Sequence, residues 1–331
     1  MTESLGITPE ENFAKLIQNW NNALISYQTP IDFCGETSIF QVNGDSDSKS
    51  DSPIIVMSNR GFSLRKELMQ MQREASKERR EKMLPPRWTN DGDLCFLCDN
   101  VGQAESTGTN LLLDFNTYKD HIVVPNRYPI MRGHCLLVSK KHDGRNLHSA
   151  LSLEYFDTIA NLAETYGFHI IRNHAQAGMS IPNHEHSHVI PRKLFTDDGV
   201  EVLSYYPQNY RFLRTDYGEG IFALEGSRFD TLGFDRRKAI DVFQKCLKEL
   251  DRNKIIFTFG YVIPKEAEGK NGLFLLTPHK KEDANRTVAG ESPLYTKTIR
   301  AGSAFSYPEY MSFLSEHIYA RGEFPWHNYI S

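Results

Sequence analysis

The sequence predicts an α+β fold in which a mainly antiparallel β-sheet carries helices on one face. One observation behind this prediction is a set of short apolar segments between residues 111 and 195, joined by short connections, since strands connected in this way pair antiparallel. Another is an amphipathic stretch at 153–166 with helical periodicity. The same plan recurs after Phe195, which predicts an internal duplication.

The N-terminal part is expected to begin with a helix at 9–27, because its apolar residues recur at helical spacing. Short strands are expected at 37–42 and 54–57. A second, strongly charged helix is predicted at 62–83, and Pro85 and Pro86 end it.

The rest of the chain divides into two units with a similar order of elements. In the first unit, three strands, a helix and a further strand are expected at 111–115, 121–124, 133–139, 153–166 and 168–172. In the second, a strand, a helix and two strands are expected at 221–224, 235–250, 255–263 and 272–278. We therefore predict an extension at 1–92 that packs on the core, a first repeat at 93–199 and a degenerate second repeat at 200–331.

Composition excludes several classes of protein. Hydrophobic residues make up 40% of the 331 residues and charged residues 24%, which is typical of a globular chain with a core. A net charge of -4 argues against a general binder of nucleic acid or anionic membranes. The N-terminus has no basic region followed by an apolar one, as a secretory signal peptide would have. No segment approaches 18 uninterrupted apolar residues, the length typical of a membrane-spanning helix. We expect a cytoplasmic protein.

Three histidines, His184, His186 and His188, alternate along the segment 183–192. Side chains at i, i+2 and i+4 share one face of an extended strand. We call these three residues the histidine row, and their spacing is rarely needed for packing alone.

The residues His184, Glu185 and His188 also fit the motif His-Glu-x-x-His, the helical signature of zinc proteases. Pro182 and Pro191 bracket the segment and leave room for about two helical turns, which is short for a stable helix. The β-branched pair Val189–Ile190 suits a strand. We therefore disfavour the protease.

Five cysteines at uneven spacing do not form the framework of a secreted protein, and only Cys95 and Cys98 are close enough in sequence to act together. Two thiolates spaced in this way can present both sulfurs to one tetrahedral ion. His142 and His184 are the best candidates for the remaining ligands, which predicts a structural zinc site. A thioredoxin-like redox pair is the alternative.

With His184 on the metal, His186 is predicted to be a nucleophile toward phosphorus, since a neutral imidazole can carry a phosphoryl or nucleotidyl group covalently. His188 is placed to donate to a phosphate or leaving-group oxygen. Main-chain donors near Gly178 and the Ser180 hydroxyl could cradle phosphate oxygens.

Four further residues flank this segment. Asn173 is predicted to bind a ribose or phosphate oxygen, although a turn asparagine fits equally well. Arg172, Arg192 and Lys193 could neutralise phosphate charge, but exposed basic residues usually serve only solubility.

Together these residues resemble the histidine-triad superfamily, more closely its long-chain branch of galactose-1-phosphate uridylyltransferase, diadenosine tetraphosphate phosphorylase and GDP-hexose phosphorylases. The resemblance is carried by Cys95-x-x-Cys98, the segment 133–142 and the segment 173–188, and covers about residues 93–195. It implies a histidine-triad-like antiparallel sheet, zinc on Cys95, Cys98, His142 and His184, and His186 as the nucleotidylated nucleophile.

The resemblance also implies a nucleotide or nucleotide-sugar substrate, inorganic phosphate or a sugar phosphate as acceptor, and a homodimer. His188 departs from the transferase branch, which usually has Gln there, and matches the small hydrolases. We expect a nucleotidyltransferase or phosphorylase. The alternatives are a hydrolase that uses water as acceptor and a non-catalytic, zinc-stabilised nucleotide-binding protein.

Overall fold

The computed structural model describes residues 18–20, 22, 55–58, 95, 97–98, 120–126, 133–142, 151–174, 184–191, 193–195, 201–204, 224–225, 236–262, 273–280 and 298–301. Of the helix expected at 9–27, residues 18–20 and 22 are described, and they are helical. The elements expected at 37–42, 62–83 and 111–115 lie outside the described residues.

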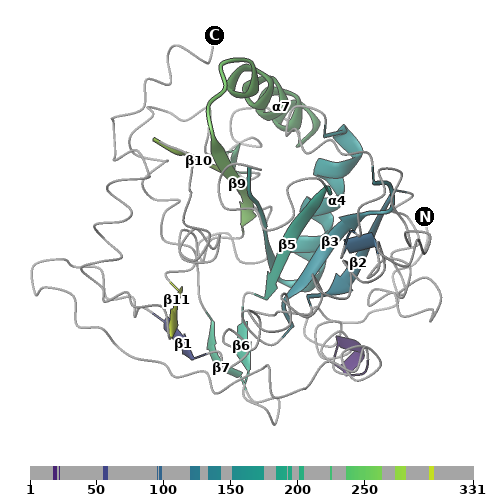
Figure 1. Ribbon diagram of the computed structural model, residues 1–331, viewed down its shortest axis with the longest axis vertical. Coiled ribbons are helices and arrows are strands. Elements are labelled where there is room, and N and C mark those ends of the chain that lie inside the picture. Colours follow the sequence, from purple (N-terminus) through teal and green to yellow (C-terminus); the bar gives the residue numbers. More distant parts are fainter. Residues whose placement is uncertain are drawn as a thin grey trace, which may run out of the picture.

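A seven-stranded sheet forms the centre of the structure (Figure 1). Its strands are β2 (His121–Pro125), β3 (Cys135–Ser139), β4 (Phe168–Arg172), β5 (His186–Pro191), β8 (Leu224–Glu225), β9 (Phe257–Val262) and β10 (Leu273–Pro278). They lie in the order β2-β3-β5-β4-β9-β10-β8, and every neighbouring pair is antiparallel. The predicted α+β class with a mainly antiparallel sheet is confirmed.

Helix α4 (Leu153–Tyr166) has the bounds that the sequence predicts. The side chain of Ser152 caps its N-terminus by accepting from the Tyr155 N–H at 3.1 Å. Gly167 ends the helix with φ of 69°, a left-handed conformation that glycine adopts without steric cost. The chain can therefore turn directly into β4.

Helix α7 (Arg236–Arg252) packs beside α4 on the same face of the sheet. The rings of Phe156 and Phe243 meet edge to face with their centroids 5.8 Å apart. Burying a phenylalanine side chain contributes about 1.5–3 kcal/mol, so this contact ties both helices to one core. We call this side of the sheet the helix face, and its strand residues in the core include Val123, Leu137, Phe168, Ile170 and Phe259.

The opposite side of the sheet carries the histidines. Across the β3–β5 pair, His186 lies opposite Val138 and His188 opposite Leu136, and directly opposed residues point to the same face. On this histidine face, Ile122, Val124, Leu136 and Val138 form a second apolar cluster with Cys95, Leu97 and Cys98. The cysteine segment is thus fixed by apolar packing next to the histidine row.

Two small sheets lie apart from the central one (Figure 1). β1 (Ile55–Ser58) pairs in parallel with β11 (Thr298–Ala301), and β6 (Lys193–Phe195) pairs with β7 (Glu201–Ser204). Only β1 was expected from the sequence. The domain boundaries at 92 and 199 stay predictions. Among the described helices, none is long and apolar enough to cross a membrane.

Candidate active site

The histidine row lies at the start of β5. His186 and His188 are strand residues, whereas His184 precedes the strand by two positions. The extended backbone rules out the helical His-Glu-x-x-His arrangement, because residues 184 and 188 are not one helical turn apart. The strand prediction is confirmed for His186 and His188, with the strand beginning later than expected.

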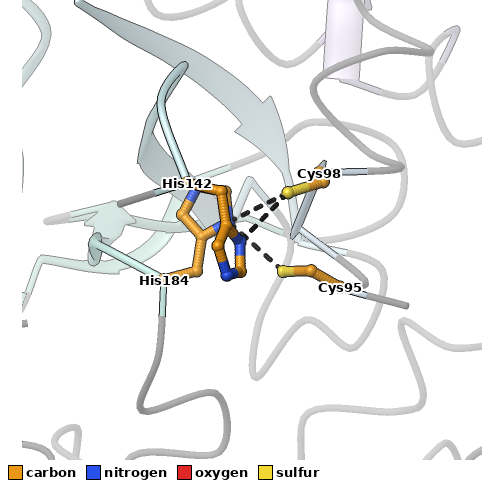
Figure 2. A group of neighbouring side chains, drawn as sticks. All are labelled: Cys95, Cys98, His142 and His184. Carbon is orange, nitrogen blue, oxygen red and sulfur yellow. Dashed lines mark hydrogen bonds between the residues drawn. The ribbon is translucent and has the colours of Figure 1, made fainter. Parts of the chain in front are cut away.

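Four side chains converge beside this strand start (Figure 2). The Nδ1 atom of His184 lies 3.2 Å from the Cys95 sulfur and 3.4 Å from the Cys98 sulfur. The Nδ1 atom of His142 lies 3.2 Å from the Cys98 sulfur and 3.2 Å from Nδ1 of His184. These are the four residues that the sequence singles out as ligands, and they form a cluster that could hold a metal ion.

The geometry of the cluster fits a tetrahedral ion. Metal–nitrogen bonds of about 2.0–2.1 Å place two tetrahedral nitrogen ligands roughly 3.3 Å apart, and the two Nδ1 atoms are 3.2 Å apart. Nε2 of His184 lies 2.8 Å from the carbonyl oxygen of Ser139. A carbonyl only accepts, so Nε2 carries the proton and Nδ1 keeps its lone pair free for a metal ion between the four ligands. A hydrogen bond from the second ring nitrogen to a carbonyl is the outer-shell contact typical of a metal-binding histidine.

Electrostatics separate this cysteine pair from the other buried cysteines. The hydrogen bond from Cys98 lowers the pKa of Cys95 to about 3, and contacts with His184 add to this effect against the opposing effect of burial. Burial alone raises the pKa of Cys135, and burial next to Glu249 raises that of Cys246. Cys95 is therefore held as the thiolate that binds metals, whereas Cys135 and Cys246 are inert thiols.

His186 is buried, with 5% of its surface exposed. A backbone carbonyl two residues earlier in the sequence orients its ring. Its Nδ1 atom lies 2.8 Å from the carbonyl oxygen of His184. Because this oxygen can only accept, the proton of the neutral ring sits on Nδ1 and the lone pair on Nε2. This is the tautomer in which an imidazole can attack through Nε2.

His188 contacts a second histidine that the sequence analysis did not assign to the site. Its Nδ1 atom lies 3.0 Å from Nε2 of His134, which is fully buried at the entrance to β3. The side-chain amide of Asn126 reaches the same His134 ring at 3.3 Å, and the Trp20 indole donates to the His134 carbonyl at 3.0 Å. One imidazole of the pair donates and the other accepts, so the tautomer of His188 depends on that of His134.

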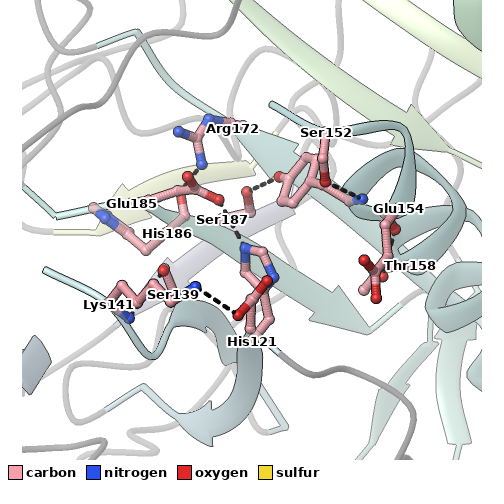
Figure 3. A network of polar contacts seen from close by, with 12 residues as sticks. His121, Ser139, Lys141, Ser152, Glu154, Thr158, Arg172, Glu185, His186 and Ser187 are labelled. Atoms are coloured by element: carbon pink, nitrogen blue, oxygen red, sulfur yellow. Dashed lines mark hydrogen bonds and ion pairs between the residues drawn. The ribbon is translucent and has the colours of Figure 1, made fainter. Parts of the chain in front are cut away.

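A buried cation, Arg172, lies on the helix face of the sheet, opposite the face that carries the histidine row. Arg172 is 0% exposed, its guanidinium donates to the His186 carbonyl at 3.3 Å, and it lies 5.6 Å from the centre of the Tyr155 ring (Figure 3). The interpretation of Arg172 as an exposed basic residue is therefore wrong. Arg172 is two positions after Ile170 in β4 and therefore points to the same face, toward the core. This period of two in the sequence was a signal from which its burial could have been predicted.

Glu185 lies between the first two histidines and joins the same network. Its carboxylate pairs with Nε2 of His121 at 2.7 Å. Burial would raise the pKa of Glu185, but the hydrogen bond from His121 and the charge of Arg172 outweigh it and lower that pKa. The hydroxyl groups of Tyr155 and Ser187 are hydrogen-bonded to each other beside this pair (Figure 3). Each described residue from 184 to 187 thus has a polar contact that restrains the start of β5.

Asn173 follows β4 directly and is 1% exposed. Its side-chain oxygen accepts a hydrogen bond from the Thr258 hydroxyl at 3.1 Å, so it is held by a neighbouring strand. The predicted phosphate-binding residues Gly178, Ser180 and Arg192 lie outside the described residues, and their roles stay predictions.

Sequence reasoning missed His134, Asn126 and His121. Each lies at or beside an end of β2 or β3. The available signal was polar side chains at the ends of otherwise apolar strands. The hydrogen-bond partners of these three residues could not be predicted from the sequence, because they depend on the order of the strands in the sheet.

Residues 90–191 match a family described as a domain of unknown function, DUF4922. No curated protein matches the chain. Among solved structures, yeast Ap4A phosphorylase Apa2 is similar in its complex with Ap4A (TM-score 0.49, 12% identity, 92% of both chains covered) and in its complex with AMP (TM-score 0.45, 11% identity, 91% of both chains covered). Likenesses this weak leave the function to be argued from the site itself.

Proposed function

We propose that this protein is a nucleotidyltransferase of the phosphorylase type that works through a covalent nucleotidyl-histidine at His186. The observation that carries the proposal is the contact between Nδ1 of His186 and the His184 carbonyl at 2.8 Å. It keeps the lone pair on Nε2 before attack. After attack it stabilises the cationic ring, because Nδ1–H still faces an acceptor.

The chemistry proceeds in two displacements. Nε2 of His186 attacks the α-phosphorus of a nucleoside polyphosphate or nucleotide sugar, forming a P–N bond as the bond to the leaving phosphate or sugar-phosphate oxygen breaks. A second phosphate then attacks the same phosphorus, forming a P–O bond and returning the electron pair of the P–N bond to Nε2. In both steps His188, held by His134, is the donor to the phosphoryl or leaving oxygen.

The substrate-binding roles are assigned to neighbours of the row. Asn173 binds a phosphate oxygen, and the backbone at Gly178 with the Ser180 hydroxyl cradles the others. Arg192 adds positive charge. The position of Asn173 directly after β4, beside the start of β5, supports its part in this assignment.

Zinc is the metal that best suits the cluster. Two thiolates and two imidazoles in a tetrahedral arrangement are a set of donors typical of zinc. Four protein ligands would fill the coordination sphere of such an ion and leave no open position, which is typical of a structural site. Its role is to tie Cys95 and Cys98 to the exit of β3 and to the residue that precedes β5.

An internal duplication accounts for the second half of the chain, the repeat predicted at 200–331. The order helix, strand, strand occurs as α4-β4-β5 and again as α7-β9-β10, and β4 and β9 pair with each other near the middle of the sheet. Each helix is followed by a residue with positive φ, Gly167 at 69° and Lys254 at 56°. These features support descent of both units from one repeat, of which the second lost the histidine row.

A hydrolase is the second candidate, and the contact of His188 with His134 favours it, because a coupled pair of imidazoles could activate water. The hydrolase would form the same covalent intermediate as the phosphorylase and would differ only in using water as the acceptor.

We expect wild-type protein to acquire an acid-labile, alkali-stable label at His186. The probes are diadenosine tetraphosphate, UDP-glucose and GDP-mannose, each carrying 32P at the phosphorus next to the nucleoside. His186→Ala should lose the label and at least about a thousand-fold in turnover, since it removes the nucleophile. His174→Gln, which removes an imidazole outside the row, serves as control. Equal labelling of His186→Ala would point to the non-catalytic binding protein.

Phosphate dependence separates the two enzymatic candidates. With the probe that labels the protein, we expect turnover to require inorganic phosphate or a sugar phosphate, and the nucleotide product to carry one phosphate from that acceptor. Mass spectrometry of products formed in 18O-phosphate and in 18O-water identifies the acceptor. Release of the nucleoside monophosphate at the same rate without phosphate would establish the hydrolase.

Metal content tests the cluster. Purified protein should contain one zinc ion per chain, and Cys98→Ser should lose it together with several kcal/mol of stability, because binding of a structural zinc ion contributes directly to folding. Cys246→Ala, a buried cysteine of α7 remote from the cluster in sequence, should keep the metal. Elemental analysis that finds wild-type and Cys98→Ser proteins equally metal-free would contradict the assignment.

A further inference from the structure

A chain of three buried polar side chains joins the two halves of the central sheet. The Thr258 hydroxyl lies 3.1 Å from Oδ1 of Asn173 and 3.1 Å from Nε2 of His279. Exposure is 1% for Asn173, 0% for Thr258 and 5% for His279. Buried polar groups cost free energy that apolar residues of similar size would not, so a purely packing role gives no reason for three of them in a row.

Strand pairing places this chain beside the histidine row. Ile171 pairs with His188 across β4–β5, and Arg172 pairs with Phe259 across β4–β9. Asn173, the next residue, therefore lies at the sheet end where β5 begins with His186 and where β9 begins next to Thr258. His279 follows β10, whose last residue, Pro278, pairs with Phe257.

The two hydrogen bonds that join these three side chains run in one direction. A hydroxyl has a single proton, and that of Thr258 is donated to Oδ1 of Asn173. The contact between Thr258 and His279 must then run the other way, with Nε2–H of His279 donating to the Thr258 oxygen. The order is therefore His279 to Thr258 to Asn173, and consecutive hydrogen bonds of this kind strengthen one another.

In this arrangement the Asn173 amide is oriented with its oxygen toward Thr258. With Oδ1 turned toward Thr258, the amide nitrogen lies on the other side of the planar group, and this nitrogen only donates. Phosphate oxygens only accept. Reversal of the amide would direct its carbonyl oxygen toward a phosphate, where two acceptors repel each other.

We propose that Thr258 and His279, both from the second half of the chain, are positioning residues that fix the Asn173 amide as a hydrogen-bond donor to phosphate oxygens of a nucleotide bound at His186. This inference rests on the proposed function and assigns the second half a part in the active site. Neither residue touches the reacting atoms, since both act through Asn173.

The test uses the full-length protein and the three 32P-labelled probes. Thr258→Val removes the hydroxyl at nearly constant volume, and Thr258→Ser keeps it. We expect the single-turnover labelling rate of Thr258→Val to fall about 100-fold, the size of effect seen when a preorganised donor is misplaced. Thr258→Ser should restore it to within about threefold, an allowance for the lost methyl group.

A double-mutant cycle distinguishes positioning from a general loss of structure. If Thr258 acts through Asn173, Thr258→Val adds nothing to the defect of Asn173→Ala, whereas independent effects multiply. His279→Leu, with His279→Gln as the variant that keeps a donor, repeats the test and replaces it if Thr258→Val does not fold.

The outcomes are distinct. Slow labelling of Thr258→Val, rescue by serine and no further loss in Asn173→Ala would support the inference. Labelling of Thr258→Val at the wild-type rate, or multiplying defects in the double variant, would overturn it while leaving the proposed function intact. Failure of the wild-type protein to be labelled by any probe would overturn both.

Discussion

A single hydrogen bond connects the candidate metal-binding cluster with His186, the proposed nucleophile. The carbonyl of His184 accepts from Nδ1 of His186 at 2.8 Å, while the side chain of His184 faces Cys95 and Cys98. A metal that fixes the His184 ring also restrains the backbone around that carbonyl. The orientation and tautomer of His186 then follow from the position of the His184 backbone.

The sheet provides the rigidity that this arrangement needs. The Ser139 N–H donates to the Glu185 carbonyl at 3.0 Å, and the Ser139 carbonyl accepts from His184, so the exit of β3 holds both residues that precede β5. Arg172 holds the His186 carbonyl from the other face. Consecutive carbonyls from 184 to 186 are thus each occupied, and an exposed loop could not keep three neighbouring peptide groups in such fixed directions.

Local signals in the sequence were strong enough to predict α4 and β4 with the observed bounds, because Ser152 and Gly167 mark the helix ends and the periodicity changes between them. The four residues of the cluster were also predicted, since thiolate pairs and alternating histidines are rare without a role. By contrast, the His134–His188 and His121–Glu185 contacts, the buried state of Arg172 and the β1–β11 pair depend on strand order and long-range pairing. No local pattern carries that information.

We infer that the His184 carbonyl fixes His186 as the Nδ1–H tautomer with its lone pair on Nε2. The most direct measurement is a long-range 1H–15N NMR correlation on protein labelled with 15N-histidine at neutral pH, with the His186→Ala variant identifying the signals of that ring. The account predicts a protonated Nδ1 and an unprotonated Nε2 for His186. A proton on Nε2, or a ring that exchanges equally between both tautomers, would contradict it.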